Sequence, residues 1–115
     1  MCRLVEISFV NTKVAKELAD EQMILREHGA DNRRRICRRL AQLLSAENLE
    51  ALRKLPQLRA HELAGDRAGQ ISVDVKHPRR LRLLPDHAEV PRKPDGGLDW
   101  TRVTRVKLLG IIDTH

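Results

Sequence analysis

The sequence predicts a single α+β domain in which helices cover one face of an antiparallel sheet. Two observations carry this prediction. Apolar residues recur at helical spacing between residues 11 and 55, whereas from residue 58 they alternate with polar residues at a period of two. The chain of 115 residues also has the length of one domain, so residues 1–115 are expected to form a single unit.

A strand and a helix are expected at the start of the chain. Residues 3–9 alternate in the manner of a short strand. Asn11 or Thr12 is a suitable cap for a helix that continues to Gly29, a residue that favours helix C-termini. The apolar half of this helix consists of Val14, Ala15, Leu18, Ala19, Met23 and Leu25. Ile24 falls outside that half.

A second helix capped by Asp31 and a short third helix over 45–55 complete the helical region. The apolar stripe of the second helix consists of Ile36, Leu40, Leu43 and Leu44. Its other face carries an arginine ridge made of Arg33, Arg34, Arg35, Arg38 and Arg39. This ridge is either a solvated helix face or a docking surface for phosphates or an acidic partner.

The second half of the chain is expected to be a meander of strands over 58–63, 70–76, 79–84 and 101–112. In the third of these strands Leu81 and Leu83 face inward, which leaves Arg80 and Arg82 outward. In the last strand the residues in the core phase are Val106, Leu108 and Ile112, although Gly110 can mark a bulge. The segment 85–99 contains three prolines and a Gly-Gly pair, which indicates a long irregular loop.

Composition narrows the classes of function. Lys and Arg number 22 against 16 Asp and Glu, and the net charge of +6 favours anionic partners such as nucleic acid. Phe9 and Trp100 are the only aromatic residues, which excludes a base-stacking platform. Cys2 and Cys37 lack metal-ligand spacing, so no metal or cofactor and a reducing, cytoplasmic setting are expected. No apolar run is long enough to span a membrane.

Strand phase predicts a candidate site on the outward face of the sheet. If the last strand keeps its phase, the residues that share this face with Arg80 and Arg82 are Arg105, Lys107, Asp113 and His115. Such a set suits RNA cleavage by internal transesterification, because a histidine can transfer protons and an arginine can bind phosphate without a metal ion. The alternative is that His115 is an exposed terminal residue and Arg80 a surface arginine.

Three motifs together resemble the HigB branch of the RelE/ParE toxin superfamily. They are LRAHELAGDRAGQISVDV, PRRLRLL and DGGLDWTRVTRVKLLGIIDTH, which lie within residues 58–115. The resemblance implies a RelE-like fold, with an N-terminal strand and two to three helices packed on one face of an antiparallel sheet. The layout of the N-terminal half agrees with that expectation.

The resemblance also implies a function. Such proteins are toxins of type II toxin–antitoxin modules, which act as ribosome-dependent mRNA endonucleases. The implied partners are a HigA-like helix-turn-helix antitoxin, the ribosome with its mRNA and, through the antitoxin complex, operator DNA. The implied catalytic residues are His61, Arg80, Asp113 and His115. Those implied to bind the substrate phosphate are Arg67, Arg82, Lys76, Arg105 and Lys107, while Gly65 and Asp66 are implied to shape a turn.

Two positions depart from the family pattern. Ala64 stands where a lysine is common, and Thr114 stands where the family has a tyrosine. These departures leave open a second reading, a catalytically weak or inactive homologue that acts as an antitoxin-binding module. A third reading is a ParE-like gyrase inhibitor, against which the terminal Asp-x-His argues because gyrase poisoning requires no acid–base pair.

Overall fold

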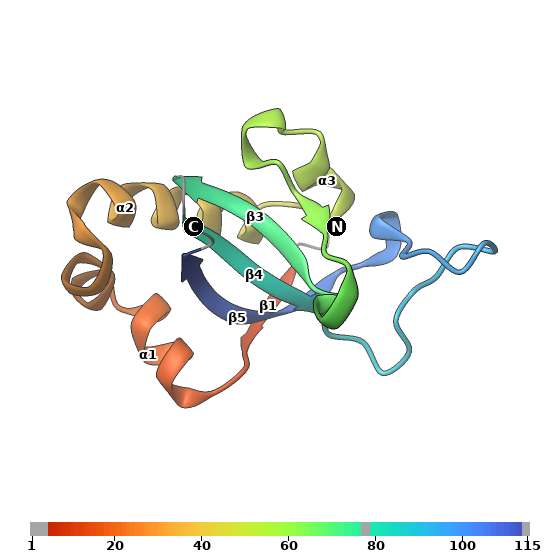
Figure 1. Ribbon diagram of the computed structural model, residues 1–115, viewed down its shortest axis with the longest axis horizontal. Coiled ribbons are helices and arrows are strands. Elements are labelled where there is room, and N and C mark those ends of the chain that lie inside the picture. Colours follow the sequence, from red (N-terminus) through yellow and green to blue (C-terminus); the bar gives the residue numbers. More distant parts are fainter. Residues whose placement is uncertain (1–4, 77–78, 114–115) are drawn as a thin grey trace.

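The structure, a computed structural model, describes residues 5–76 and 79–113, and these residues form a helical layer against a sheet (Figure 1). The strands of the sheet are β1 (Glu6–Phe9), β2 (His61–Glu62), β3 (Ile71–Lys76), β4 (Arg79–Pro85) and β5 (Arg105–Asp113). The helices are α1 (Thr12–Ala19), α2 (Glu21–Leu44) and α3 (Glu50–Arg53). The predicted α+β class is therefore confirmed. Within the described ranges, no helix is long and apolar enough to cross a membrane.

The sheet is mixed rather than antiparallel. Its strands follow the order β1-β5-β4-β3-β2, and β1 runs parallel to β5 while the other neighbours are antiparallel. The antiparallel expectation is therefore wrong for β1. The physical reason is that alternation in a strand specifies which side chains face the core, but neither the strand's neighbour nor its direction.

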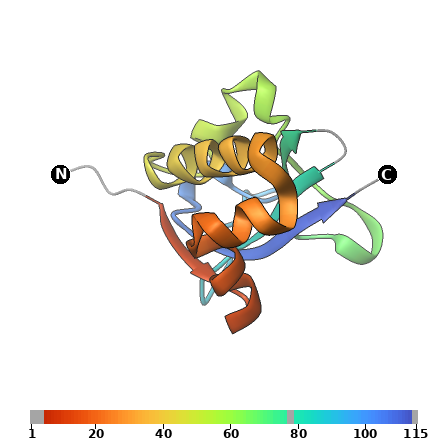
Figure 2. The ribbon, with the colours of Figure 1, turned by 90° about the vertical axis from the view of Figure 1, so that its left-hand side faces the viewer.

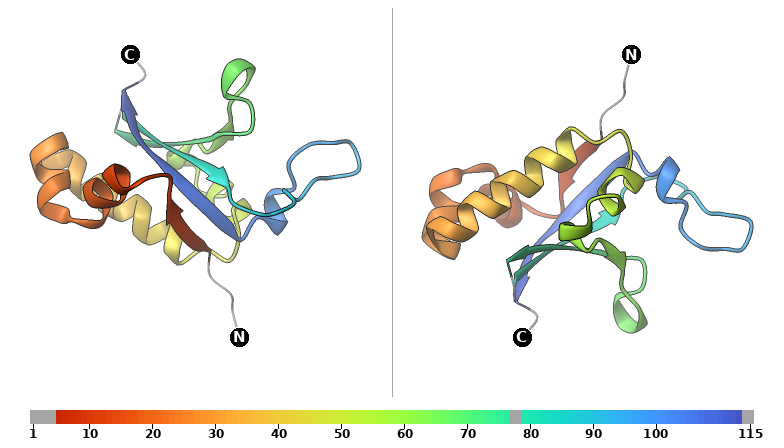
Figure 3. Two further views of the ribbon diagram at one scale, coloured as in Figure 1. Left: turned by 90° about the horizontal axis from the view of Figure 1, so that it is seen from below. Right: turned by 90° about the horizontal axis from the view of Figure 1, so that it is seen from above.

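The helices α1 and α2 pack on one face of this sheet, as Figures 2 and 3 show. The core between the layers joins Val14 and Leu18 of α1 to Leu81, Leu83 and other buried residues of the strands. We call the opposite side of the sheet the open face. Because successive strand residues point to opposite sides, the polar residues that alternate with this core lie on the open face.

The helix boundaries differ from the prediction at Asp20. This residue is extended, and its carboxylate accepts a hydrogen bond from the backbone N–H of Gln22, so it ends α1 and caps α2. The interruption resets the helical phase, and Ile24, predicted to lie outside the apolar half, is 1% exposed in the core. Gly29, predicted as a helix end, has the non-helical φ of 86° and ψ of 167°, so two helices meet at a kink there within the range of α2, as predicted. The Asp31 carboxylate, predicted as the cap of the second helix, pairs with Lys76 and Arg35 instead.

A β-bulge interrupts the alternation of β5. Arg82 of β4 lies opposite Gly110, whereas the next residue, Leu83, lies opposite Leu108. Leu109 is therefore the extra residue of the bulge. Gly110 has φ of 132°, a backbone conformation that L-amino acids with a side chain rarely adopt.

The bulge changes which residues of β5 face the core. Beyond it, Ile111 lies opposite Leu81 and packs against the core, and Ile112 lies opposite Arg80 on the open face. The predicted core phase of β5 is therefore correct for Val106 and Leu108 and wrong for Ile112.

Replacing Gly110 by valine is expected to lower the free energy of unfolding by about 1–3 kcal/mol. The cost comes from backbone strain, because a Cβ atom at this position would meet Val14 Cγ2 at an ordinary contact distance of 3.8 Å. Urea unfolding measures the effect, with Ile112→Val as a control on the same strand that leaves the backbone conformation unchanged. Equal stability of Gly110→Val and wild type would show that the bulge does not need glycine.

The loop between β4 and β5 is more ordered than predicted. It contains a small hairpin in which Arg92 pairs with Leu98, and the Lys93 N–H donates to the Gly97 carbonyl at 2.8 Å. Leu98 is buried, as is Trp100, over whose ring the Arg53 guanidinium lies at 4.4 Å. The loop is therefore anchored in the core at its C-terminal end, and its tip extends away from the sheet (Figure 1).

Candidate anion-binding site on the open face

A row of polar residues crosses the open face. His61 of β2 lies opposite Ser72 of β3, which in turn lies opposite Arg82 of β4. Directly opposite residues of neighbouring strands point to the same side of a sheet, so these three side chains are neighbours. The next row is formed by Asp74 and Arg80.

Arg82 is the most unusual member of the row because it is a nearly buried cation, only 7% exposed. No hydrogen bond or ion pair joins its guanidinium to another residue in the part of the chain that the structure describes. Burial, and next the nearby positive charge of Arg67, lowers the pKa of Arg82 below its ordinary value. Desolvation and repulsion both disfavour this charge, and a bound anion would relieve both.

Ser72 supplies a second polar group without a partner. Its side chain is 1% exposed, and its Oγ finds no hydrogen-bond partner among the described residues. An unsatisfied buried hydroxyl costs about 1–3 kcal/mol. Ser72 lies directly opposite Arg82. An anion bound to the guanidinium would therefore also lie close to this hydroxyl. Ser72 was not among the site residues predicted from the sequence. The signal that could have identified it is a small polar residue at an outward position of a strand.

The turn that brings Arg67 to this face is the short 3-10 helix η2 (Gly65–Arg67). Gly65 begins the turn with φ of 68°, and its carbonyl accepts a hydrogen bond from the Ala68 N–H at 3.1 Å. Asp66 is exposed within the turn. The turn brings the charge of Arg67 close enough to Arg82 to lower the pKa of the Arg82 guanidinium.

His61 is exposed and its imidazole is oriented by the preceding backbone. Its Nδ1 lies 2.8 Å from the carbonyl oxygen of Arg59, which can only accept a hydrogen bond. Nδ1 therefore carries the proton, and in the neutral ring Nε2 is free to accept another. Arg59 has φ of 46°, the one positive φ outside glycine among the described residues, so the orientation of His61 depends on a strained residue.

Arg80 shares the open face but, unlike Arg82, has a carboxylate partner. Its Nε lies 3.4 Å from Asp74 Oδ1, and Arg59 Nε lies 3.8 Å from the other oxygen of the same carboxylate. The charge of Arg80 is thus partly balanced in the free protein. Of the two outward arginines of β4, Arg82 is the one without a carboxylate partner among the described residues.

The register of β5 does not bring Asp113 to Arg80. In the backbone register, Asp113 lies opposite Arg79 and Ile112 lies opposite Arg80. The bulge before Gly110 shifts this part of β5 by one residue relative to unbroken alternation. The side chain of Asp113 is not among the described parts of the structure, so its predicted place on the outward face stays a prediction. Thr114 and His115 lie outside the described residues.

Arg79 belongs to a polar cluster on the helix side. Its Nη1 lies 2.6 Å from His28 Nδ1, and His28 Nε2 lies 2.6 Å from Glu17 Oε1. An arginine can only donate, so His28 accepts through Nδ1 and donates through Nε2 to the carboxylate. This cluster connects α1, α2 and the start of β4.

The remaining predicted phosphate-binding residues do not join Arg82. Lys76 forms an ion pair with Asp31 of α2 and is thereby directed to the helix side of the sheet. Arg105 lies opposite β1 and pairs with Glu6, with Nε and Oε2 3.3 Å apart. Both basic residues therefore have carboxylate partners.

Lys107 has the phase of the open face but lies on β5 between Ser8 and Leu84. Its Nζ is 4.0 Å from Asp86 Oδ1. Like Arg105, Lys107 precedes the bulge in β5, whereas Gly110, the residue opposite Arg82, follows it.

The arginine ridge of α2 is narrower than predicted. Arg39 is 6% exposed, its Nε donates to the Asp74 carbonyl at 2.8 Å, and its Nη1 donates to Gln42 Oε1 at 3.1 Å. Burial, followed by the charges of Arg38 and Arg35, lowers the pKa of Arg39. Arg39 therefore attaches α2 to β3 and does not belong to an exposed docking surface.

Within the described ranges, no three His, Cys, Asp or Glu side chains gather as a metal-ligand set. No protein-family model, curated protein or solved structure matches this chain. What the open face can do therefore follows from its own geometry: it offers two arginines and a buried hydroxyl to an anion, beside a histidine with a free ring nitrogen.

Proposed function

We propose that the protein is an endoribonuclease that cleaves RNA through attack of a ribose 2′-hydroxyl on the adjacent phosphate. The observation that carries this proposal is Arg82, a nearly buried guanidinium with Arg67 beside it and no carboxylate partner among the described residues. A guanidinium binds phosphate bidentately and stabilises the charge that develops on a pentacoordinate phosphorus. The exposed His61 on the same row supplies the proton acceptor.

In this mechanism His61 Nε2 accepts the proton of the 2′-hydroxyl while the 2′-oxygen forms a bond to phosphorus. The bond from phosphorus to the 5′-oxygen breaks, and that oxygen takes up a proton from a general acid. The products are a 2′,3′-cyclic phosphate and a free 5′-hydroxyl. His115 is the acid that the sequence predicts, and no step requires a metal ion.

The wider setting of the proposal is a type II toxin–antitoxin module. The chain would act on mRNA in the ribosome and be neutralised by a HigA-like antitoxin, whose complex would bind operator DNA. The support for this setting is the resemblance of residues 58–115 to HigB toxins, the α+β architecture and the net charge of +6.

The register of Asp113 favours a second candidate, a toxin homologue with weak or no nuclease activity that binds its antitoxin. Asp113 lies opposite Arg79 rather than Arg80, so these two members of the implied catalytic set are not directly opposite each other in the register. Ala64 and Thr114 also replace a lysine and a tyrosine of the family pattern.

Expression of the chain alone is expected to arrest growth and to produce mRNA fragments that end in 2′,3′-cyclic phosphates. The purified protein is expected to cut ribosome-bound mRNA at the same positions. A 2′-deoxy nucleotide at the cut position is the matched control, because it removes only the nucleophile. Intact transcripts in the presence of soluble, folded protein would contradict the nuclease proposal, and tight antitoxin binding by that protein would support the second candidate.

His115→Ala and Arg80→Ala are each expected to abolish cleavage without unfolding the domain. Circular dichroism checks the fold, and mapping of RNA ends checks the activity. Full activity in His115→Ala would remove the terminal histidine from the mechanism. Full activity in Arg80→Ala would show that the Asp74–Arg80 pair serves the fold alone.

A further inference from the structure

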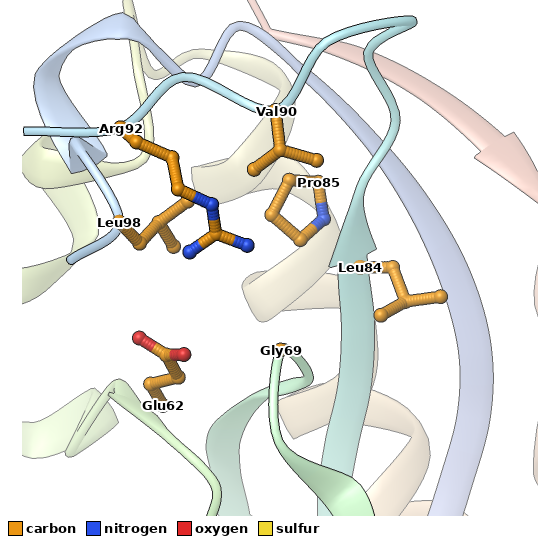
Figure 4. A pocket seen from close by; sticks show the side chains of 7 residues that line it. All are labelled: Glu62, Gly69, Leu84, Pro85, Val90, Arg92 and Leu98. Atoms are coloured by element: carbon orange, nitrogen blue, oxygen red, sulfur yellow. The ribbon is translucent and has the colours of Figure 1, made fainter. Parts of the chain in front are cut away.

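A pocket of about 130 Å³ opens where the turn before β3 meets the loop that follows β4 (Figure 4). Its lining residues are Glu62, Gly69, Leu84, Pro85, Val90, Arg92 and Leu98. A single water needs about 10–15 Å³ of such volume, so the pocket is much larger than a one-water site. Apolar side chains from two segments form most of its wall.

Two opposite charges face each other across this pocket. Figure 4 shows the Glu62 carboxylate and the Arg92 guanidinium directed toward one another from opposite sides. No ion pair joins them, and the Glu62 carboxylate has no hydrogen-bond partner among the described residues. Arg92 uses only Nη1, which donates to the Gly96 carbonyl at 3.2 Å. A ligand would bind in the gap between the Glu62 carboxylate and the Arg92 guanidinium.

Arg92 is held in place before any ligand binds. Its backbone pairs with the buried Leu98, and its carbonyl accepts a hydrogen bond from Arg102 Nη2 at 2.7 Å. The backbone that carries Arg92 is thus fixed by its contacts with Leu98 and Arg102, which lowers the entropic cost of binding.

We propose that this pocket binds a guanine base of the RNA that the open face cleaves. Guanine offers two parallel donors on one edge, N1–H and N2–H, which match the Glu62 carboxylate. It offers two acceptors, O6 and N7, on another edge, which match the Arg92 fork. Adenine lacks the two-donor edge, and a splayed base of single-stranded RNA is read through just these edges.

The position of the pocket connects it to the candidate site. Glu62 follows His61 directly in β2, and successive residues of a strand point to opposite sides. Glu62 lies opposite the core residue Ile71, so it points away from the row that contains Arg82, but β2 is the edge strand of the sheet. A nucleotide whose phosphate binds Arg82 would therefore place a flanking base in the pocket by passing around this edge. This inference rests on the proposed nuclease function, and it makes guanine a specificity determinant of the cut.

Binding of nucleosides to the full chain tests the pocket without any cleavage. Nucleosides carry no phosphate, so Arg82 does not contribute to their binding. By calorimetry or NMR titration, guanosine is expected to bind at least about tenfold more tightly than inosine, which lacks the N2 amino group, or adenosine. Glu62→Gln is expected to remove the preference for guanosine over inosine, and Glu89→Gln, an exposed residue of the same loop outside the pocket, is expected to keep it.

RNA cleavage provides the second arm of the test. Wild type is expected to cut next to guanine, and Glu62→Gln to lose that preference while it retains its fold. Guanosine selectivity without cleavage would sustain the pocket and overturn the nuclease proposal. Cleavage without any guanine preference, or equal binding of the three nucleosides, would overturn the pocket and leave the nuclease proposal standing.

Discussion

Replacing Arg82 by methionine is expected to lower RNA cleavage by about 10²–10³-fold, the loss typical of removing one group that stabilises transition-state charge. The same replacement is expected to leave the domain at least as stable as wild type. A nearly buried cation beside Arg67, with no carboxylate partner among the described residues, destabilises the fold, whereas a methionine of similar length fills the same space.

Two measurements separate these effects. Thermal unfolding gives the stability, and the increase in Tm on adding phosphate reports the anion site, because a ligand that binds only the folded state stabilises it. Wild type is expected to gain stability with phosphate, and Arg82→Met is not. Arg26→Met, an exposed arginine of α2, is the matched control for lost charge. A large loss of stability in Arg82→Met would show that Arg82 is a structural residue with another partner.

Replacing His61 by alanine is expected to reduce cleavage by about 10²–10⁴-fold, the usual contribution of one general base. The imidazole also donates a hydrogen bond to the Arg59 carbonyl, so loss of activity in the alanine variant alone would not separate catalysis from orientation of the loop. His61→Asn resolves this, because its amide can still donate to that carbonyl but cannot accept a proton at neutral pH.

Both His61 variants are therefore expected to be inactive and folded, and added imidazole is expected to restore part of the activity of His61→Ala. Initial rates on a short mRNA bound to ribosomes measure the effect. Activity in His61→Asn close to that of wild type would show that His61 has a structural role and that another residue is the general base.

The pattern of β3 and β4 was predictable because it depends only on neighbours in the chain. Ile71, Val73, Leu81 and Leu83 are buried as their alternation predicts, and Arg82 follows on the other face. From Ile71 to Asp74, β3 pairs with β4 without a register shift, so a period of two applies there. The same local logic predicted the turn at Gly65.

The helical region shows how a local pattern fails. A single helical wheel drawn through Asp20 placed Ile24 outside the apolar half, yet Ile24 is in the core. The carboxylate of Asp20 bonds to the Gln22 N–H and starts a new helix, and that competition between a side chain and the helix is decided by how α1 and α2 pack.

The sequence by itself determined the α+β class, the face on which Arg80 and Arg82 lie, and the basic charge that points to an anionic partner. Tertiary structure alone decided that Arg80 pairs with Asp74 while Arg82 does not, and that the bulge places Ile112 opposite Arg80. The physical reason is that alternation is a property of one strand, whereas a side chain's partner and a bulge's position are set by the strands beside it. The candidate site depends on both.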